Sequence, residues 1–180
     1  MTTYAVVGRP VTRQEGPDKV SGTFLYSADV ALPGMIWGKV LRSPFPHARI
    51  VNIDATRALG LAGVRAVITG KDTAGMRVGR MVRDVPLLAE DTVRFVGEKV
   101  AAVAAVDPDT AEEALTRIDV DYEPLPAIFD PLAAMEPGAP LVHADWASYE
   151  RDDQMVADGN TISYSTIVKG DIDAALAEAD

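Results

Sequence analysis

The pattern of apolar and polar positions is clearest across residues 84–123, and the rest of the chain is organised around this stretch. Residues 100–106 are apolar throughout and few in number, which predicts a strand covered on both faces. Asp107 and Pro108 end this run and can begin a helix, because aspartate caps helix N-termini and proline is preorganised at the first helical position. Residues 118–123 alternate apolar and polar with period two, so they predict a half-exposed return strand.

Three further strands are predicted upstream, at residues 35–42, 48–54 and 64–69. Gly38 indicates a bulge or a close backbone approach in the first of them. Strict alternation divides the second strand between two faces: Arg49, Val51 and Ile53 on one, Ile50 and Asn52 on the other. Asp54 can cap a short helix at residues 56–59.

The segments outside this region have weaker patterns. Residues 1–22 contain several turn signals and predict an extended arm, and a Pro-Gly step at residues 33–34 predicts a tight turn. Residues 71–83 show no regular pattern. Residues 127–160 are rich in Pro, Gly, Asp and Ala, which predicts a linker with one helical turn at residues 131–135.

The last twenty residues again carry regular patterns. Residues 161–168 alternate apolar and polar and predict a strand, and residues 172–179 predict the start of a helix. The sequence stops at Asp180 within this helical pattern and without a C-terminal cap. We therefore expect the chain to be a piece of a longer protein.

Composition bounds the chemistry of the chain. Its 180 residues can bury a useful core, and 48% of them are apolar, as in a globular protein. There is no cysteine, which excludes disulfides, thiol catalysis and cysteine-ligated zinc or iron–sulfur clusters in this chain. No apolar run approaches the roughly 20 residues of a membrane span, and the N-terminus lacks a signal-peptide pattern. We expect a cytoplasmic protein.

Charge is unevenly distributed along the sequence. Residues 1–100 contain 14 basic and 9 acidic residues, whereas residues 101–180 contain 3 basic and 18 acidic residues. The acidic half argues against nucleic-acid binding, which normally needs a basic stripe with interleaved aromatic residues. A modest basic excess around Arg77, Arg80 and Arg83 is typical of a solvated face, and an acidic partner surface is the alternative.

Four single residues are candidates for chemistry, and each has a simpler structural interpretation. His47 and His143 are far apart and lack the spacing of metal ligands, so structural or surface roles are favoured. Glu98, after Val96 and Gly97, could be a general base on a glycine turn, but an exposed carboxylate is the simpler expectation. Ser43 has no His–Asp pair to activate it as a nucleophile.

Three carboxylates of residues 118–123 project to one side at period two: Asp119, Asp121 and Glu123. They could collect a cation through oxygen ligands, although a solvated strand face is the simpler interpretation. Glycine-rich loops of the P-loop or dinucleotide-binding kind are absent from the sequence. The residues alone therefore assign no catalytic, cofactor-binding or metal-ligating position.

Four groups of residues form a recognisable series. They are residues 8–22, with Gly8-Arg9-Pro10-Val11; residues 26–50, with Leu41-Arg42-Ser43-Pro44; residues 63–72; and residues 84–126, with Val96-Gly97-Glu98. Their order resembles the N-terminal a/b hammerhead region of the molybdopterin-binding large subunit of the molybdenum hydroxylases, the xanthine dehydrogenase, aldehyde oxidase and carbon monoxide dehydrogenase family. Residues 170–180 resemble the entry into the family's first molybdopterin domain.

This resemblance implies an α/β (α+β) fold of the a/b hammerhead type, with a mixed β-sheet and packed helices. It divides the chain into an extended arm at residues 1–22, a hammerhead domain at residues 23–126, a linker at residues 127–160 and the start of a truncated molybdopterin-binding domain at residues 161–180. The resemblance covers essentially the whole chain in the right order.

The family's activity is the hydroxylation of a substrate carbon with water-derived oxygen by a multi-subunit enzyme. The resemblance implies a molybdenum–molybdopterin cofactor, [2Fe–2S] clusters and FAD for the complete enzyme, none of them bound by this chain. Its implied partners are the remaining molybdopterin-binding domains, the iron–sulfur subunit and the flavin subunit. The family's pterin-binding glycine loops and its catalytic glutamate have no counterpart here, and Glu98 belongs to the hammerhead motif instead.

Two functions remain open at this level. The first is the N-terminal packing and interaction part of such a subunit, inactive by itself. The second is a free-standing hammerhead module with a non-enzymatic protein-binding role, and a homo-oligomer is compatible with either. An exposed apolar patch is expected where the remainder of the subunit would pack.

Overall fold

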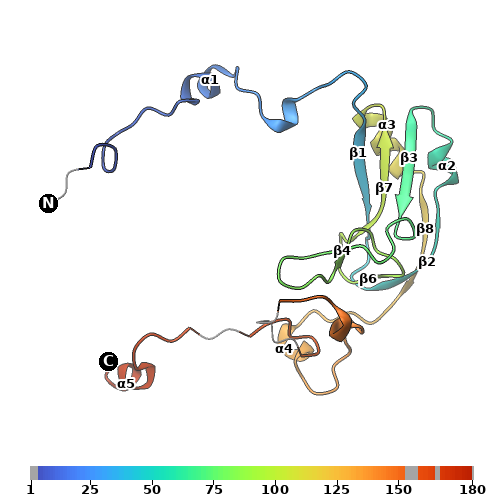
Figure 1. Ribbon diagram of the computed structural model, residues 1–180. Helices are drawn as coiled ribbons and strands as arrows, with labels where there is room; N and C mark the ends of the chain where they lie inside the picture. Colours follow the sequence, from blue (N-terminus) through green and yellow to red (C-terminus); the bar gives the residue numbers. More distant parts are fainter. Residues whose placement is uncertain (1–3, 153–157, 165–166, 180) are drawn as a thin grey trace. The chain divides into compact units, whose positions relative to one another are not determined.

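The computed structural model describes residues 4–152, 158–164 and 167–179 of the chain (Figure 1). Two compact units make up the chain, Met1–Met35 and Ile36–Asp180. The first unit is small and contains no strand among its described residues. The second unit holds every described strand, so the fold is built there.

The first unit contains a helix that the sequence analysis missed. Helix α1 spans Gly16–Ser21 and is followed by the 3₁₀ helix η1 at Ser27–Asp29. Pro17 lies in the first turn of α1, and Gly22 ends it in the left-handed conformation, with φ of +75°. Proline at the start and glycine just past the end are the usual helix boundaries, so the extended arm was a wrong prediction over residues 16–21.

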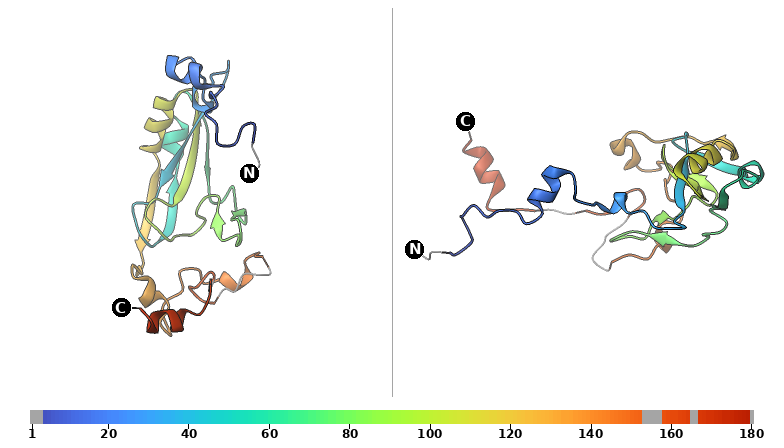
Figure 2. Two further views of the ribbon diagram at one scale, coloured as in Figure 1. Left: turned by 90° about the vertical axis from the view of Figure 1, so that its left-hand side faces the viewer. Right: turned by 90° about the horizontal axis from the view of Figure 1, so that it is seen from above.

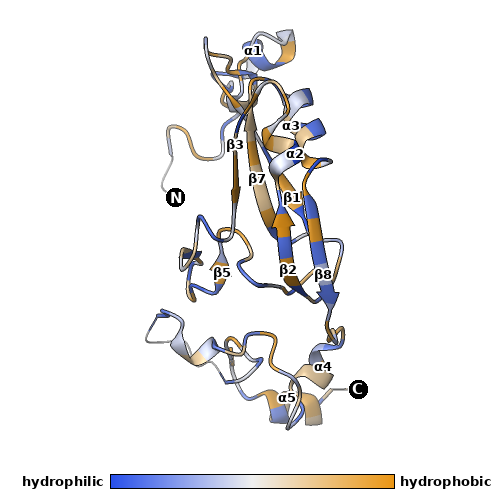
Figure 3. Cartoon of the chain, turned by 90° about the vertical axis from the view of Figure 1, so that its right-hand side faces the viewer, coloured by the Kyte–Doolittle hydropathy of each residue, from blue (hydrophilic) through white to orange (hydrophobic). Residues whose placement is uncertain are grey.

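A three-stranded antiparallel sheet forms the centre of the second unit. Strand β7, Lys99–Ala105, lies between β1, Trp37–Arg42, and β3, Val64–Thr69. Figure 3 shows β7 apolar along nearly its whole length. Four of its seven residues are buried, which confirms the predicted central strand: Val100, Ala101, Val103 and Ala105.

A second antiparallel sheet is formed by β6, Thr92–Val93, with β2, Ala48–Asp54, and β8, Asp119–Pro124. The β2–β8 register shifts between Ile50 and Asn52, which marks a bulge. Val51 is therefore turned outward, while Ile50 and Ile53 both pack against the core. The strict alternation predicted for this strand is wrong, because the bulge moves Ile53 to the face that holds Ile50.

The bulge or close backbone approach predicted at Gly38 is wrong as well. Gly38 lies directly opposite Ala104 in regular pairing, and a Cβ added at Gly38 would meet the Val103 carbonyl oxygen at 3.9 Å, an ordinary contact. The irregularity in β1 falls instead between Leu41 and Arg42. Residues 71–83, expected to be irregular, contribute only the two residues of β4, Arg77–Val78, which pair with β5, Val85–Pro86.

Two helices pack on one face of the central sheet, as the two views of Figure 2 show. Helix α3, Pro108–Leu115, is capped by Asp107, whose carboxylate accepts a hydrogen bond from the Thr110 backbone N–H at 2.7 Å. Helix α2, Thr56–Leu59, begins where the Asp54 carboxylate accepts from the Thr56 N–H. Both predicted helices are confirmed.

The helices and sheets share one apolar interior. Its centre is formed by small buried residues of β7, α2 and α3, together with Ile118: Ala58, Ala101, Val103 and Ala114. A neighbouring cluster under β2 and β6 contains Ala48, Ala89, Val93 and Val100. The α+β class with packed helices is confirmed, although every pairing among the described strands is antiparallel, so the sheets are not one mixed sheet.

Residues beyond β8 form short elements: helix α4 at Pro131–Ala134, the 3₁₀ helix η2 at Trp146–Ser148 and helix α5 at Ile172–Ala177. The strand predicted at residues 161–168 is wrong over its described residues, where Thr161 makes only an isolated bridge to Asp158. Alternation stabilises a strand only when a neighbour pairs with it, and no described strand does so here. Residues 165–166 of that segment lie outside the described residues.

Candidate functional site

Glu98 is buried, contrary to the expectation of an exposed carboxylate. Its side chain is 4% exposed, and its Oε2 accepts a hydrogen bond from the Arg94 backbone N–H. Gly97 has φ of +93°, a conformation that favours glycine, so the chain can turn back between Arg94 and Glu98. Burial raises the pKa of Glu98, and the hydrogen bond from Arg94 partly offsets that effect. We interpret this carboxylate as the group that closes the 94–98 turn.

Ser43 is tied to the same turn through the backbone. Its N–H donates to the Glu98 carbonyl at 2.9 Å, and its carbonyl accepts from the Gly97 N–H at 2.8 Å. The Ser43 hydroxyl accepts from the Phe45 N–H and donates to the Phe45 carbonyl, each at 3.0 Å. The hydroxyl therefore stabilises the bend after β1, and both of its hydrogen-bonding roles are in use.

The two histidines lie in separate environments. His47 Nδ1 lies 2.6 Å from the Pro126 carbonyl oxygen, and the His47 carbonyl accepts from the Leu125 N–H at 3.0 Å. These contacts fix the course of the chain as it leaves β8. His143 Nδ1 instead lies 2.9 Å from the Tyr149 hydroxyl, within the segment that follows α4.

Tyr149 connects His143 to an ion pair that sequence reasoning missed. Its hydroxyl donates to Asp145 Oδ1 at 2.8 Å, and Asp145 Oδ2 lies 3.6 Å from Arg77 Nη2. The Arg77 guanidinium also lies over the Tyr149 ring, 4.8 Å from its centroid. Burial raises the pKa of Tyr149 to about 12, and its hydrogen bond to Asp145 acts in the same direction. Only folding brings Arg77 to this group, so no local sequence signal could have identified it.

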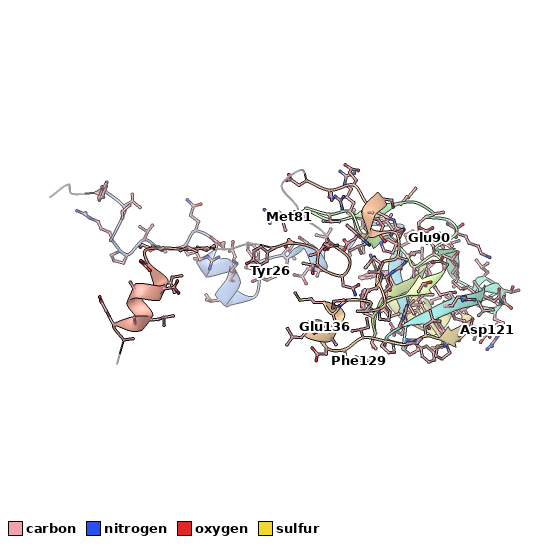
Figure 4. The ribbon with its side chains drawn as sticks, turned by 90° about the horizontal axis from the view of Figure 1, so that it is seen from below. Tyr26, Met81, Glu90, Asp121, Phe129 and Glu136 are labelled. Carbon is pink, nitrogen blue, oxygen red and sulfur yellow. The ribbon has the colours of Figure 1, made fainter. Side chains whose placement is uncertain are left out.

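Two of the three carboxylates of β8 are paired with arginines of neighbouring elements. Asp119 lies 3.1 Å from Arg57, and Glu123 lies 3.3 Å from Arg49; all four side chains are more than half exposed. Within the described part of the chain, no group of three or more histidine and carboxylate side chains could hold a metal ion. The arrangement is that of a solvated strand face crossed by ion pairs. Asp121 is the third carboxylate of this strand. Figure 4 shows it on the opposite side of the second unit from Met81.

Apolar side chains gather beside the 94–98 turn. Phe95 and Val96 are 54% and 63% exposed, and Phe129 and Leu141 are also exposed. They line a cavity of about 250 Å³ together with His47. Figure 4 shows Phe129 at the outer rim of the second unit. The turn closed by Glu98 therefore presents two apolar side chains at the mouth of an apolar hollow.

The two terminal segments are also apolar and exposed. No described residue of 4–35 or of 161–179 is buried. The exposed large apolar residues of the first segment are Tyr4, Val6, Val7, Val11, Val20, Leu25, Tyr26, Val30 and Leu32. Those of the second are Ile162, Tyr164, Ile167, Val168, Ile172 and Leu176. Surfaces of this kind normally lie against another part of a protein, so the functional site best supported by the geometry is an interaction surface.

Comparison with known proteins identifies the fold. Residues 21–126 match the family model of the aldehyde oxidase and xanthine dehydrogenase a/b hammerhead domain. The chain is 37% identical over 177 residues to a probable xanthine dehydrogenase subunit of Bacillus subtilis, covering 97% of this chain and 22% of that protein. It is 35% identical over 178 residues to the nicotinate dehydrogenase large molybdopterin subunit of Eubacterium barkeri, covering 98% of this chain and 39% of that subunit.

A solved structure supports the same assignment over nearly the full chain. The Cu,Mo-CO dehydrogenase in its carbon monoxide reduced state aligns with a TM-score of 0.73 and 36% identity, covering 96% of this chain and 22% of that one. The chain therefore belongs to the aldehyde oxidase and xanthine dehydrogenase a/b hammerhead family. It spans only 22% to 39% of the length of the two curated relatives described above.

Proposed function

We propose that this chain is the N-terminal structural and interaction part of the molybdopterin-binding subunit of a multi-subunit molybdenum hydroxylase. The complete enzyme would oxidise a substrate carbon with water-derived oxygen, and this chain would be inactive by itself. The observation that carries the proposal is the match of 97% of the chain to 22% of a xanthine dehydrogenase subunit. The two relatives thus match nearly all of this chain and are much longer than it.

The residues present do not fit the cofactors of such an enzyme. With no cysteine, the chain cannot ligate a [2Fe–2S] cluster through thiolates. Glycine-rich phosphate-binding loops are absent from its sequence. Structural contacts engage both histidines and three of the carboxylates described above: His47, His143, Glu98, Asp119 and Glu123. We therefore assign the molybdenum–molybdopterin cofactor, the clusters and FAD to other parts of the complex.

The exposed apolar residues support a packing role. We propose that residues 161–180 begin a molybdopterin-binding domain, that residues 127–160 connect it to the hammerhead domain at residues 23–126, and that residues 1–22 form an arm. The remaining molybdopterin-binding domains would cover the apolar surface around Phe95 and Phe129. The iron–sulfur and flavin subunits are the further partners in this proposal, and the cytoplasm is the proposed compartment. Among the described residues, no helix is long and apolar enough to cross a membrane.

Co-purification tests the proposal. The native protein is isolated from its source under mild conditions, its partner chains are identified, and molybdenum and iron are measured. We expect both metals and partner chains to accompany this chain. A metal-free 180-residue chain without partners would contradict the proposal.

The alternative is a free-standing hammerhead module that binds other proteins without taking part in catalysis. The observation that favours it is the interior of the second unit, where buried side chains of its own strands and helices pack together. Hydrogen exchange of residues 161–164 and 167–179 in the isolated monomer separates the two proposals. Protected amides there would favour the free-standing module, because a packing segment deprived of its neighbours should exchange rapidly.

A further inference from the structure

Residues 142–152, called the strap below, are fastened to the β4–β5 region by backbone hydrogen bonds. The Arg83 N–H donates to the Glu150 carbonyl, and the Asp152 N–H donates to the Met81 carbonyl, each at 2.9 Å. These two bonds flank an antiparallel bridge between Val82 and Arg151. The strap thus adds one short rung of sheet beside residues 81–83.

A chain of side-chain hydrogen bonds lies within the strap. Because the Tyr149 hydroxyl donates its only proton to Asp145, its oxygen is left to accept from His143 Nδ1–H. Asp145 in turn pairs with Arg77 of β4, and the Arg77 guanidinium lies over the Tyr149 ring. The buried Tyr149 therefore links a neutral His143 to the strand on which the strap rests.

Charged groups of four segments face His143. Arg94, from the turn after β6, and Arg77, from β4, both disfavour a positive charge on this imidazole. Asp84, before β5, and Asp145, on the strap, favour it. Burial is the largest influence and acts with the arginines, so the pKa of His143 is lowered from its ordinary value of 6.5. Uptake of a proton on Nε2 therefore costs free energy while the strap is closed.

We propose that the strap is a pH-sensitive device, closed over β4 and β5 when His143 is neutral and released when this side chain takes up a proton. Release exposes the imidazole and removes it from the two arginines. Linkage sets the direction in which strap closure depends on pH. Because the pKa of His143 is lower in the closed state, closure is most stable above about pH 6.5 and loses stability as the pH falls below that value. Each unit by which the pKa is lowered corresponds to a tenfold change in the closing equilibrium.

Hydrogen exchange measured by mass spectrometry on the complete native protein, with any partner chains, tests the proposal. Exchange of the strap is compared at about pH 7.5 and about pH 5.5, on either side of the titration of an ordinary histidine, after correction for the intrinsic rates. We expect the protection of the Asp152 and Arg83 amides to fall at the lower pH, by at most about tenfold for the titration of one histidine. The amides of β7 report on global unfolding and should stay protected at both pH values.

Three variants make the test specific. In His143→Gln the side-chain amide can still donate to Tyr149 but cannot gain a charge, so protection should no longer depend on pH. Tyr149→Phe breaks the hydrogen-bond chain and should reduce protection already at about pH 7.5. His47→Gln is the matched control, and its strap should respond to pH like that of the unmodified protein.

Three results would overturn the proposal. Two of them are an unchanged pH response in His143→Gln and the loss of that response in His47→Gln. The other comes from an NMR titration of the unmodified protein, which remains decisive if the His143 variant does not fold. A His143 imidazole that titrates at or above pH 6.5 would mean that closure does not resist protonation.

Discussion

Gly70 packs directly against the carbonyl oxygen of Ala89. A Cβ added at Gly70 would lie 2.1 Å from that oxygen, a distance that no side chain can occupy without moving the backbone. Ala89 itself is fully buried in the cluster under β2 and β6. The turn after β3 and the segment before β6 are therefore held together by a contact between two main chains.

Gly70→Ala should destabilise the second unit because the added methyl group must displace the Ala89 backbone. We expect the free energy of unfolding to fall by about 1–3 kcal/mol, the usual cost of overpacking. Gly38→Ala is the matched control, since its Cβ would meet the nearest atom at 3.9 Å and should change stability by less than about 1 kcal/mol. Urea unfolding of both variants provides the measurement, and equal stabilities would show that the Gly70 contact can relax.

Removal of the Glu98 carboxylate should loosen the turn that presents Phe95 and Val96. In Glu98→Ala the Arg94 N–H loses its acceptor, and a buried donor without a partner costs about 1–3 kcal/mol. Glu98→Gln keeps an acceptor oxygen in the same place and should retain most of the stability. If both variants lost the same stability, the carboxylate would act through its charge rather than through this hydrogen bond.

Glu98 should also make stability depend on pH. Its pKa is raised in the folded state, chiefly by burial, so the folded protein binds a proton more readily than the unfolded chain does. The stabilising contribution is complete below the ordinary value of 4.5 and is lost as the pH rises through the raised pKa. Urea unfolding across this range should show that decline in the unmodified protein and not in Glu98→Gln.

Asp107→Ala should weaken the start of α3. Both carboxylate oxygens of Asp107 accept hydrogen bonds from Thr110, one from the backbone N–H and one from the hydroxyl. We expect the melting temperature to fall by about 2–4 °C, as for the loss of a typical N-cap in a domain of this size. Asp109→Ala is the control, because this residue is in the first turn but does not cap the helix.

The Asp107 cap should be sensitive to acid. Hydrogen bonds from Thr110 lower the pKa of Asp107, so the ionised form is favoured in the folded state. Its contribution is present above the unfolded pKa of roughly 3.9 and is lost as the pH falls through the lower folded value. The difference in melting temperature between the unmodified protein and Asp107→Ala should therefore shrink in strong acid.

The ion pair between Arg57 and Asp119 should contribute little to stability. Its atoms lie 3.1 Å apart, but the two side chains are 64% and 60% exposed, so water and salt screen the attraction. A double-mutant cycle with Arg57→Ala and Asp119→Ala should give a coupling below about 1 kcal/mol that decreases as salt is added. A larger, salt-independent coupling would indicate that the pair is effectively buried.

Elements with a strong local signal could be predicted from the sequence. The apolar run of β7, the Asp107-Pro108 start of α3 and the alternation of β8 each specify one local structure, and all three are confirmed. Helix α2 follows for the same reason, since Asp54 provides its first hydrogen-bond acceptor. In these segments local preference and tertiary packing agree.

Features that depend on distant parts of the chain could not be predicted. The bulge at Val51 is set by the pairing of β2 with β8, about 70 residues later in the sequence, as the register shows. The burial of Glu98 depends on the bend at Ser43, and the Tyr149 hydrogen bonds depend on a strap whose composition predicted a linker. Helix α1 did have a local signal, in Pro17 and Gly22, which the surrounding turn residues obscured.

The basic excess around Arg77 and Arg83 illustrates how charge counts along a sequence can mislead. Arg77 pairs with Asp145, and Arg83 pairs with Glu150 at 3.1 Å, so acidic residues of the second half of the chain neutralise both arginines. The contrast between a basic first half and an acidic second half is thereby reduced in the folded protein. An acidic partner surface would find less positive charge here than the sequence indicated.

The position of β7 restricts the order in which the protein can form during synthesis. Among the described strands, β1 and β3 have β7 as their only partner, although both precede it in the sequence. A ribosome that has released residues 1–98 has therefore released two strands whose backbone groups are unpaired and open to other chains. The central sheet can close only after residue 105 emerges, so β1 and β3 are exposed to pairing with other chains until then.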